Sequence, residues 1–281
     1  KRPERTGPVE PPGDLVRLDL LDPHHPANVY LAGRGFDPVQ LGLKYSVGYC
    51  VRARPEFPQV HGRIVIPMIQ DGAWVGWQAR YCGEADWHHV PKYYNLPGVP
   101  KQRYLYNYDR AKAFRLVVAV EGVPAVWALG DAAVALYGKT ISDYHIELFH
   151  RMAVPPGQAP RSVLFVILLD NDPVPEDPRR ARSAALFQLK TSQRLLALKQ
   201  ALGGSGSAVV RVELPEGKDA ADFDRAVVWG SIYAQVAAQG IDPAAYWDYD
   251  TCKSTRTWPI SAAVPLSSPR PLRSFTGNPA S

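Results

Sequence analysis

Cysteine is scarce in this chain of 281 residues, which has only three, at positions 50, 82 and 252. They lie far apart and form no CxxC pair, so we expect neither a disulfide framework nor a structural zinc site. We interpret all three as ordinary reduced thiols.

Long apolar runs are also missing. The longest, residues 162–169, has the length of a strand, whereas a membrane-spanning helix needs roughly 18 apolar residues or more. The chain starts at Lys1 without an initiator Met or a signal-peptide core. These features lead us to expect a cytoplasmic protein without membrane contact, processed or cut from a longer chain.

A P-loop is absent as well. Gly138, Lys139 and Thr140 resemble the end of that motif, but Ala133 stands where its first glycine is needed, which excludes an ATPase of this type.

The net charge of +5 is unevenly distributed. Residues 30–112 contain 11 Lys and Arg against 6 Asp and Glu, whereas residues 113–233 contain 13 of each kind. A basic segment beside one rich in acidic motifs suits a polyanionic substrate that is handled with metal ions. A basic face exposed to solvent explains the charge equally well.

The first half of the chain predicts an extended arm followed by a small mixed subdomain. The arm, residues 1–26, is rich in proline. Residues 27–112 then contain two short helices within 27–47, a hairpin of strands 63–68 and 73–80, and an aromatic and basic loop over 92–106.

In residues 113–240, apolar strands alternate with helices. The predicted strands are 116–120, 133–136, 162–169 and 208–212, and the predicted helices are 124–129, 143–151, 183–201 and 223–239. Strands that are apolar throughout are typical of a mainly parallel sheet covered on both faces. Residues 241–281 are rich in proline and serine, and we expect a loose tail there.

Acidic residues follow three of these four strands. They are Glu121, then Asp170 and Asp172, and finally Asp219 and Asp222. Because the carboxyl ends of parallel strands meet at one edge, the acids should converge there and repel one another. Divalent cations with oxygen ligands, Mg²⁺ or Mn²⁺, would relieve this repulsion. Phosphoryl chemistry with two metals is the natural use of such a cluster. Taken alone, Glu121 could instead be an acid that caps the N-terminus of a helix. Taken alone, the DxD pair could be a simple turn.

The acidic motifs resemble the TOPRIM pattern. They read VVAVEG at 117–122, LLDND at 168–172 and LPEGKDAAD at 214–222. Upstream, an ordered set of motifs resembles the N-terminal half of DnaG-type primase cores. The set comprises YLAGRGF (30–36), SVGYC (46–50), GRIVIPM (62–68), VGWQARY (75–81), PKYYNLPG (91–98) and KQRYLYNYDRA (101–111). The segment after the DxD pair, with Pro173, Pro175 and Pro178, is longer than this family usually has.

This resemblance implies an α/β chain in which an α+β N-terminal subdomain precedes a TOPRIM domain with a four-stranded, mainly parallel sheet. It implies synthesis of short RNA primers on single-stranded DNA from ribonucleoside triphosphates. Glu121, Asp170 and Asp172 would be catalytic and would bind Mg²⁺ or Mn²⁺, with Asp219 and Asp222 as further metal ligands. Template or nucleotide phosphates would contact Arg34, Arg80, Lys92, Lys101 and Lys139.

The family also implies partners, namely a replicative helicase and a zinc-ribbon domain in cis or in trans. The compact core favours a phage or mobile element as its source, and the working place would be a bacterial or phage-infected cytoplasm. Two alternatives stay open: a TOPRIM-family DNA nuclease using the same metals, and a non-catalytic module that binds single-stranded nucleic acid.

Overall fold

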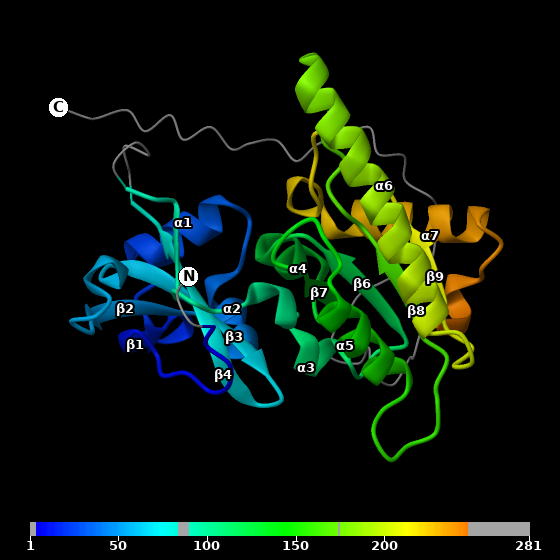
Figure 1. Ribbon diagram of the computed structural model, residues 1–281. Coiled ribbons are helices and arrows are strands. Elements are labelled where there is room, and N and C mark those ends of the chain that lie inside the picture. The colour runs from blue at the N-terminus through cyan, green and yellow to red at the C-terminus, as the bar shows by residue number, and fades with distance from the viewer. Residues whose placement is uncertain (1–3, 84–89, 174, 247–281) are drawn as a thin grey trace.

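The computed structural model describes residues 4–83, 90–173 and 175–246. Two β-sheets lie side by side in it, one from each half of the chain (Figure 1). The N-terminal sheet has the order β1-β2-β3-β4-β5, and its neighbouring strands are antiparallel. Its strands are β1 (Gly13–Arg17), β2 (Gly48–Ala53), β3 (Arg63–Gln70), β4 (Ala73–Tyr81) and β5 (Tyr93–Asn95).

The hairpin of β3 and β4 confirms the sequence prediction. Asp71 and Gly72 form its turn with φ values of 51° and 77°, the left-handed pair that suits a tight hairpin. The carboxylate of Asp109 accepts hydrogen bonds from both of their backbone N–H groups, at 3.0 and 2.9 Å. This contact fixes the hairpin tip against α3 (Tyr108–Ala111).

Two short helices, α1 (Pro26–Gly33) and α2 (Pro38–Tyr45), confirm the helical prediction for this stretch. Each has proline in its first turn, where the missing N–H costs nothing. The Asp37 carboxylate caps α2 by accepting from Val39 and Gln40. The turn between the helices places Arg34 at the end of α1.

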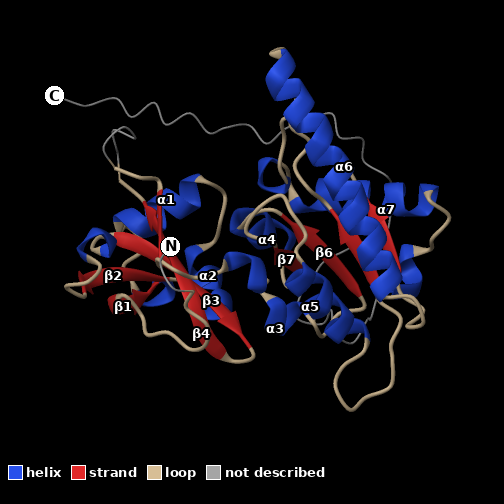
Figure 2. Cartoon of the chain, viewed as in Figure 1, coloured by secondary structure: helices blue, strands red, loops and turns tan. Residues whose placement is uncertain are grey.

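The C-terminal sheet is parallel throughout, with the order β7-β6-β8-β9. Its strands are β6 (Leu116–Val120), β7 (Ala133–Ala135), β8 (Leu164–Ile167) and β9 (Ala208–Arg211), and its helices are α4 (Val123–Leu129), α5 (Asp143–Ala153), α6 (Pro178–Ala201) and α7 (Arg225–Ala238). Helix α5 contacts α6, and α4 contacts α7. In Figures 1 and 2, α6 crosses in front of the strands and α7 behind them. The predicted α/β class with an α+β first part is therefore confirmed.

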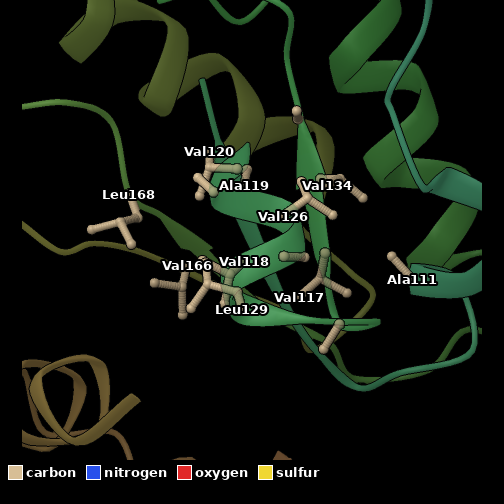
Figure 3. Packing of buried hydrophobic residues seen from close by; sticks show 14 of the residues in the cluster. Ala111, Val117, Val118, Ala119, Val120, Val126, Leu129, Val134, Val166 and Leu168 are labelled. Atoms are coloured by element: carbon tan, nitrogen blue, oxygen red, sulfur yellow. The ribbon is translucent and has the colours of Figure 1, made fainter. Parts of the chain in front are cut away.

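The buried core is continuous between the two sheets. Strands β6 and β8 are buried at every position, and Figure 3 shows Val118 and Val166 packed near Leu129 of α4. The same cluster includes Leu18 and Ile64 from the N-terminal half. Burying one such side chain contributes about 1.5–3 kcal/mol, so the shared core holds the strand ends of the parallel sheet fixed relative to the N-terminal half.

Several short elements differ from the sequence prediction. Strand β1 lies within the expected arm, β2 follows the second helix, and β5 lies in the expected loop. Helix α6 begins at Pro178 rather than 183, because the Asp177 carboxylate caps it by accepting from the Arg180 N–H at 2.8 Å. The 3₁₀ turns are η1 (Leu18–Leu20), η2 (Pro58–Val60), η3 (Lys101–Arg103), η4 (Ala220–Asp222) and η5 (Pro243–Tyr246). The expected loose tail over 241–281 begins with an ordered turn, η5, and its remainder, residues 247–281, lies outside the described residues.

No helix in the described part of the chain combines the length and the apolar character needed to cross a membrane.

Asn107 joins the two halves and provides a stability test. It is buried, has a φ of 64°, and its side-chain Nδ2 donates to the carbonyls of Asp131 and Ala133 at 3.0 and 2.8 Å. Asn107→Ala should lower the free energy of unfolding by about 2–3 kcal/mol, because two buried carbonyls lose a donor and alanine disfavours a left-handed backbone.

Urea denaturation of the variant measures this loss. Asn107→Gly should lose less, since glycine accepts the positive φ. The exposed Gln158→Ala should change the free energy by less than about 0.5 kcal/mol. Equal effects of Asn107→Ala and Gln158→Ala would contradict the account of this junction.

Candidate active site

Glu121 contacts the loops that follow two parallel strands, and it directly follows the strand between them. It directly follows β6, the strand between β7 and β8, and its side chain is only 13% exposed. Its carboxylate Oε1 accepts a hydrogen bond from the backbone N–H of Asp170, after β8, at 3.1 Å. Its own carbonyl accepts from the Gly138 N–H, after β7, at 3.2 Å. The sheet order thus brings residues from three loops to one point.

Lys139 supplies a positive charge at this point. Its Nζ lies 3.8 Å from Oε1 of Glu121 and is hydrogen-bonded to Oδ2 of Asp172. The Lys139 side chain is 37% exposed and that of Asp172 is 64% exposed. Asp172 therefore reaches outward from the edge, whereas Glu121 lies deeper.

Asp219 and Asp222 lie in the turn after β9 and bind each other's backbone. The Asp219 carboxylate accepts from the Ala221 N–H at 2.5 Å, and the Asp222 carboxylate accepts from the Asp219 N–H at 3.0 Å. This reciprocal capping of η4 is a structural role that the sequence did not reveal. It also orients Asp219, whose charge acts on Asp170.

Burial and crowding raise the pKa of three of these acids. The pKa of Glu121 rises to about 7, first because it is buried and then because Asp170 is near, while Lys139 opposes the rise. Burial followed by the charge of Asp219 raises the pKa of Asp170. Burial also raises the pKa of Asp219, against the hydrogen bond from Ala221. Each folded carboxylate is thus held at a cost that a nearby cation would relieve.

The acids approach one another without enclosing an ion. Within residues 4–83, 90–173 and 175–246, no three His, Cys, Asp or Glu side chains form a group able to hold a metal. An open site is compatible with this arrangement, since Mg²⁺ commonly takes one or two carboxylates and keeps waters and substrate phosphates in its other positions. Hard oxygen donors with raised pKa values, such as Glu121 and Asp170, fit such an ion.

A cluster of arginines and aromatic rings lies in the N-terminal half. The guanidinium of Arg80 on β4 is 4.7 Å from the ring centroid of Tyr93, and its Nε donates to the Tyr30 hydroxyl at 2.8 Å. Arg34 donates to the same hydroxyl at 3.3 Å. The charge of Arg34 also acts on Asp219, where it weakly offsets the rise in pKa that burial causes. The cluster therefore lies within electrostatic reach of the acidic edge.

The other two predicted cations differ in their surroundings. Lys101 is half-buried in η3, its Nζ is 6.0 Å from the ring centroid of Tyr137, and burial lowers its pKa. Lys101 thus contacts the ring that anchors the loop of Lys139, and among the described residues it forms no ion pair with the acids. Lys92 is exposed just before β5. In the part of the chain that the structure describes, its side chain forms no hydrogen bond or ion pair with the acids.

The sequence missed two tyrosines that organise these cations. Tyr30 and Arg34 are four residues apart, a helical spacing that signals contact, but the hydrogen bond from Arg80 is long-range. Tyr137 was hidden because its role depends on packing. Two tyrosines of the aromatic and basic loop are engaged within the protein: Tyr104 is buried, and the ring centroid of Tyr94 lies 6.1 Å from that of Trp77 in a stacked contact.

No protein-family model matches this sequence, and no curated protein matches it significantly. Two solved structures do resemble it. The RNA polymerase domain of Mycobacterium tuberculosis primase DnaG superposes with a TM-score of 0.51 and 22% identity, over 73% of each chain. The zinc-binding and RNA polymerase domains of Aquifex aeolicus primase give a TM-score of 0.50 and 21% identity, over 73% of this chain and 54% of that one.

The chain has the fold of a DnaG primase RNA polymerase domain.

In this primase fold, the antiparallel sheet carries Arg80 and the parallel sheet ends at Glu121. The fold accounts for the proximity of the two halves, and the local contacts described above account for the orientation of the side chains. The recognition of a primase core from the ordered motifs is therefore confirmed at the level of fold.

The raised pKa of Glu121 predicts a pH-dependent gain in stability on its removal. The folded value of about 7 exceeds the ordinary value of 4.5, so ionisation penalises the folded state increasingly between about pH 4.5 and 7, and fully above it. Glu121→Gln should raise the free energy of unfolding by about 1–3 kcal/mol at pH 8 without divalent cations. At about pH 4 the gain should vanish, because both states are then protonated.

Urea denaturation at the two pH values checks this difference. The exposed Glu147→Gln on α5 is the matched control and should show no comparable pH-dependent gain. A loss of stability for Glu121→Gln at pH 8 would contradict the electrostatic description of the edge.

Proposed function

We propose that this chain is the catalytic core of a DNA primase, which makes short RNA primers on single-stranded DNA. The observation that carries the proposal is the contact of Glu121 with the loops after β7 and β8, at an edge within electrostatic reach of Arg34. An acidic edge beside a cationic and aromatic surface suits a reaction in which one polyanion guides the joining of nucleoside triphosphates. The shared fold supports the same function.

In the proposed reaction, the 3′-hydroxyl of one ribonucleotide attacks the α-phosphate of the next. A phosphodiester bond forms, and pyrophosphate leaves. Glu121, Asp170 and Asp172 would hold Mg²⁺ or Mn²⁺, with Asp219 and Asp222 as further ligands. When bound, these ions compensate charge on the attacking and leaving oxygens. The protein's own contribution is placement, since buried strands fix the carboxylates before substrates arrive.

The cations of the N-terminal half would position phosphates. Arg34 and Arg80 are held by the Tyr30 hydroxyl, so their guanidinium groups are oriented before a ligand binds. Lys92 and Lys101, together with Lys139 from the C-terminal half, would add contacts to the template or to the triphosphate. Oriented guanidinium groups bind phosphate with less loss of side-chain entropy than free ones.

The division of labour follows the two sheets. We assign residues 27–112 to template and nucleotide binding, residues 113–240 to metal binding and catalysis, and residues 241–281 to a C-terminal tail. The segment 1–26, expected as an arm, adds β1 and Leu18 to the first of these units. A zinc-ribbon domain, in cis or in trans, and a replicative helicase would serve as partners. A bacterial or phage-infected cytoplasm is where a primase meets both template and nucleotides.

Glu121→Gln should reduce primer synthesis by at least about 100-fold, because the substitution removes a charge from the proposed metal site. Affinity for single-stranded DNA should stay within about twofold, since the arginine cluster is untouched. The measurement uses single-stranded DNA, labelled ribonucleoside triphosphates, and Mg²⁺ or Mn²⁺, with Glu147→Gln as the matched control.

Short labelled RNA is the expected product of the unaltered protein. Shortened DNA would instead assign the site to a nuclease, and retention of DNA without any product would make the chain a binding module. Full synthesis by Glu121→Gln would remove Glu121 from the catalytic set.

Arg34→Gln should weaken binding of single-stranded DNA and flatten its salt dependence. Loss of one phosphate contact should reduce the slope of log K against log salt concentration by about 0.7. Fluorescence anisotropy of labelled DNA over about 50 to 200 mM salt measures the slope. Arg52→Gln, at a side chain 82% exposed on β2, is the control, and equal slopes for the two variants would count against a role for Arg34 in the binding track.

A further inference from the structure

The loop after β7 delivers a lysine into the acidic edge by a constrained path. Tyr137 has a φ of 57° although it is not glycine, a conformation that costs energy for a bulky residue. The Leu136 and Gly138 N–H groups donate to the carbonyls of Val120 and Glu121, at 2.9 and 3.2 Å. The backbone is therefore anchored to the end of β6 immediately before Lys139.

The ring of Tyr137 holds this loop from the other side. It packs against the cluster of Met68, Val75 and Tyr104 from the N-terminal half, and it lies 6.3 Å from the ring centroid of Tyr106 in an edge-on contact. Because both the backbone and the ring are fixed, the fold sets the backbone position from which the Lys139 side chain extends.

The ammonium of Lys139 bridges two of the proposed metal ligands. Its Nζ contacts both Glu121 and Asp172, and its charge also acts on Asp170. The lysine ammonium is thus bound where negative charge is concentrated.

A tethered ammonium and a divalent cation compete for the same oxygens. A carboxylate oxygen of Glu121 that binds a metal ion directly cannot keep an ammonium in its first contact shell without strong repulsion between the two cations. The Lys139 side chain is partly exposed, so the ammonium can move away from the carboxylates into solvent when a metal ion binds.

We propose that Lys139 is a built-in counterion of the acidic edge, which neutralises Glu121 and Asp172 in the metal-free protein and is displaced from them when a divalent cation binds. The inference rests on the proposed function, because it assumes that the cation binds at this edge. It adds that the ammonium of Lys139 lowers the affinity of the site for metal ions below the affinity that the carboxylates alone would have.

Mn²⁺ binding measured by electron paramagnetic resonance of the free ion tests the proposal without any measurement of catalysis. Lys139→Met keeps an unbranched side chain, one atom shorter, and removes the charge. It should bind Mn²⁺ on the order of tenfold more tightly than the unaltered protein. Lys139→Arg keeps the charge and should stay within about threefold of the unaltered protein. Lys139→Gln serves as a second neutral variant should Lys139→Met fold poorly.

Thermal unfolding gives an independent reading. In a chelator, Lys139→Met should melt at a lower temperature than the unaltered protein, because the acids lose their counterion. Added Mn²⁺ should raise its melting temperature by more than that of the unaltered protein. Unchanged or weaker Mn²⁺ binding by both neutral variants would overturn the proposal. So would Mn²⁺ binding by Lys139→Arg as tight as that of Lys139→Met, because arginine keeps the charge.

Glu121→Gln separates the two possible failures. If Mn²⁺ binding depends on Glu121 but not on the charge at position 139, the counterion role falls and the metal site stands. If neither the unaltered protein nor the Lys139 variants bind Mn²⁺ in a way that depends on Glu121, the metal site of the proposed function falls, and the counterion role falls with it.

Discussion

Repulsion among carboxylates at the end of a parallel sheet is the constraint that governs this molecule. Glu121, Asp170 and Asp219 follow three strands of one sheet, and burial makes their ionised forms costly. Isolated flexible acids would move apart into solvent. Here β6 and β8 are buried along their length and β9 at its two central residues, so the hydrophobic core outweighs the repulsion and holds the charges near one another.

Three features of the surrounding structure partly offset this repulsion. Backbone N–H groups of Asp170 and Ala221 donate to the Glu121 and Asp219 carboxylates. Lys139 supplies a cation directly, and Arg34 supplies one from the other half of the chain at longer range. None of these closes the edge into a cage, so it stays accessible to ions and phosphates. This openness is what the proposed binding of a phosphate-bearing substrate together with a metal ion requires.

Much of the fold was predictable because local patterns agreed with the final packing. The apolar run at 116–120 predicts a buried strand that ends just before an acid, and the structure confirms β6 with Glu121 directly after it. The turn at Asp71 and Gly72 likewise carried enough information to define a hairpin. The missed strands β1 and β5 are short edge strands, whose residues alternate weakly and gain their structure from pairing with β2 and β4.

The site was only partly predictable, and the reason is physical. The chain order identifies which acids follow strands, but not the reciprocal capping of Asp219 and Asp222 or the hydrogen bond from Arg80 to Tyr30. Those contacts join residues through rotamers and long-range packing, which leave no periodic trace in the sequence. Lys139 is an intermediate case. The sequence predicts its place after β7, whereas only the three-dimensional structure shows its contacts with Glu121 and Asp172.

The most direct test of a metal-binding acidic edge is a crystal soaked in Mn²⁺ and measured for anomalous scattering. The account predicts a peak in contact with Glu121 or Asp170, with the Lys139 ammonium moved away from Glu121. An ordered Mn²⁺ found only elsewhere, with Lys139 still bound to Glu121 at saturating metal, would contradict it.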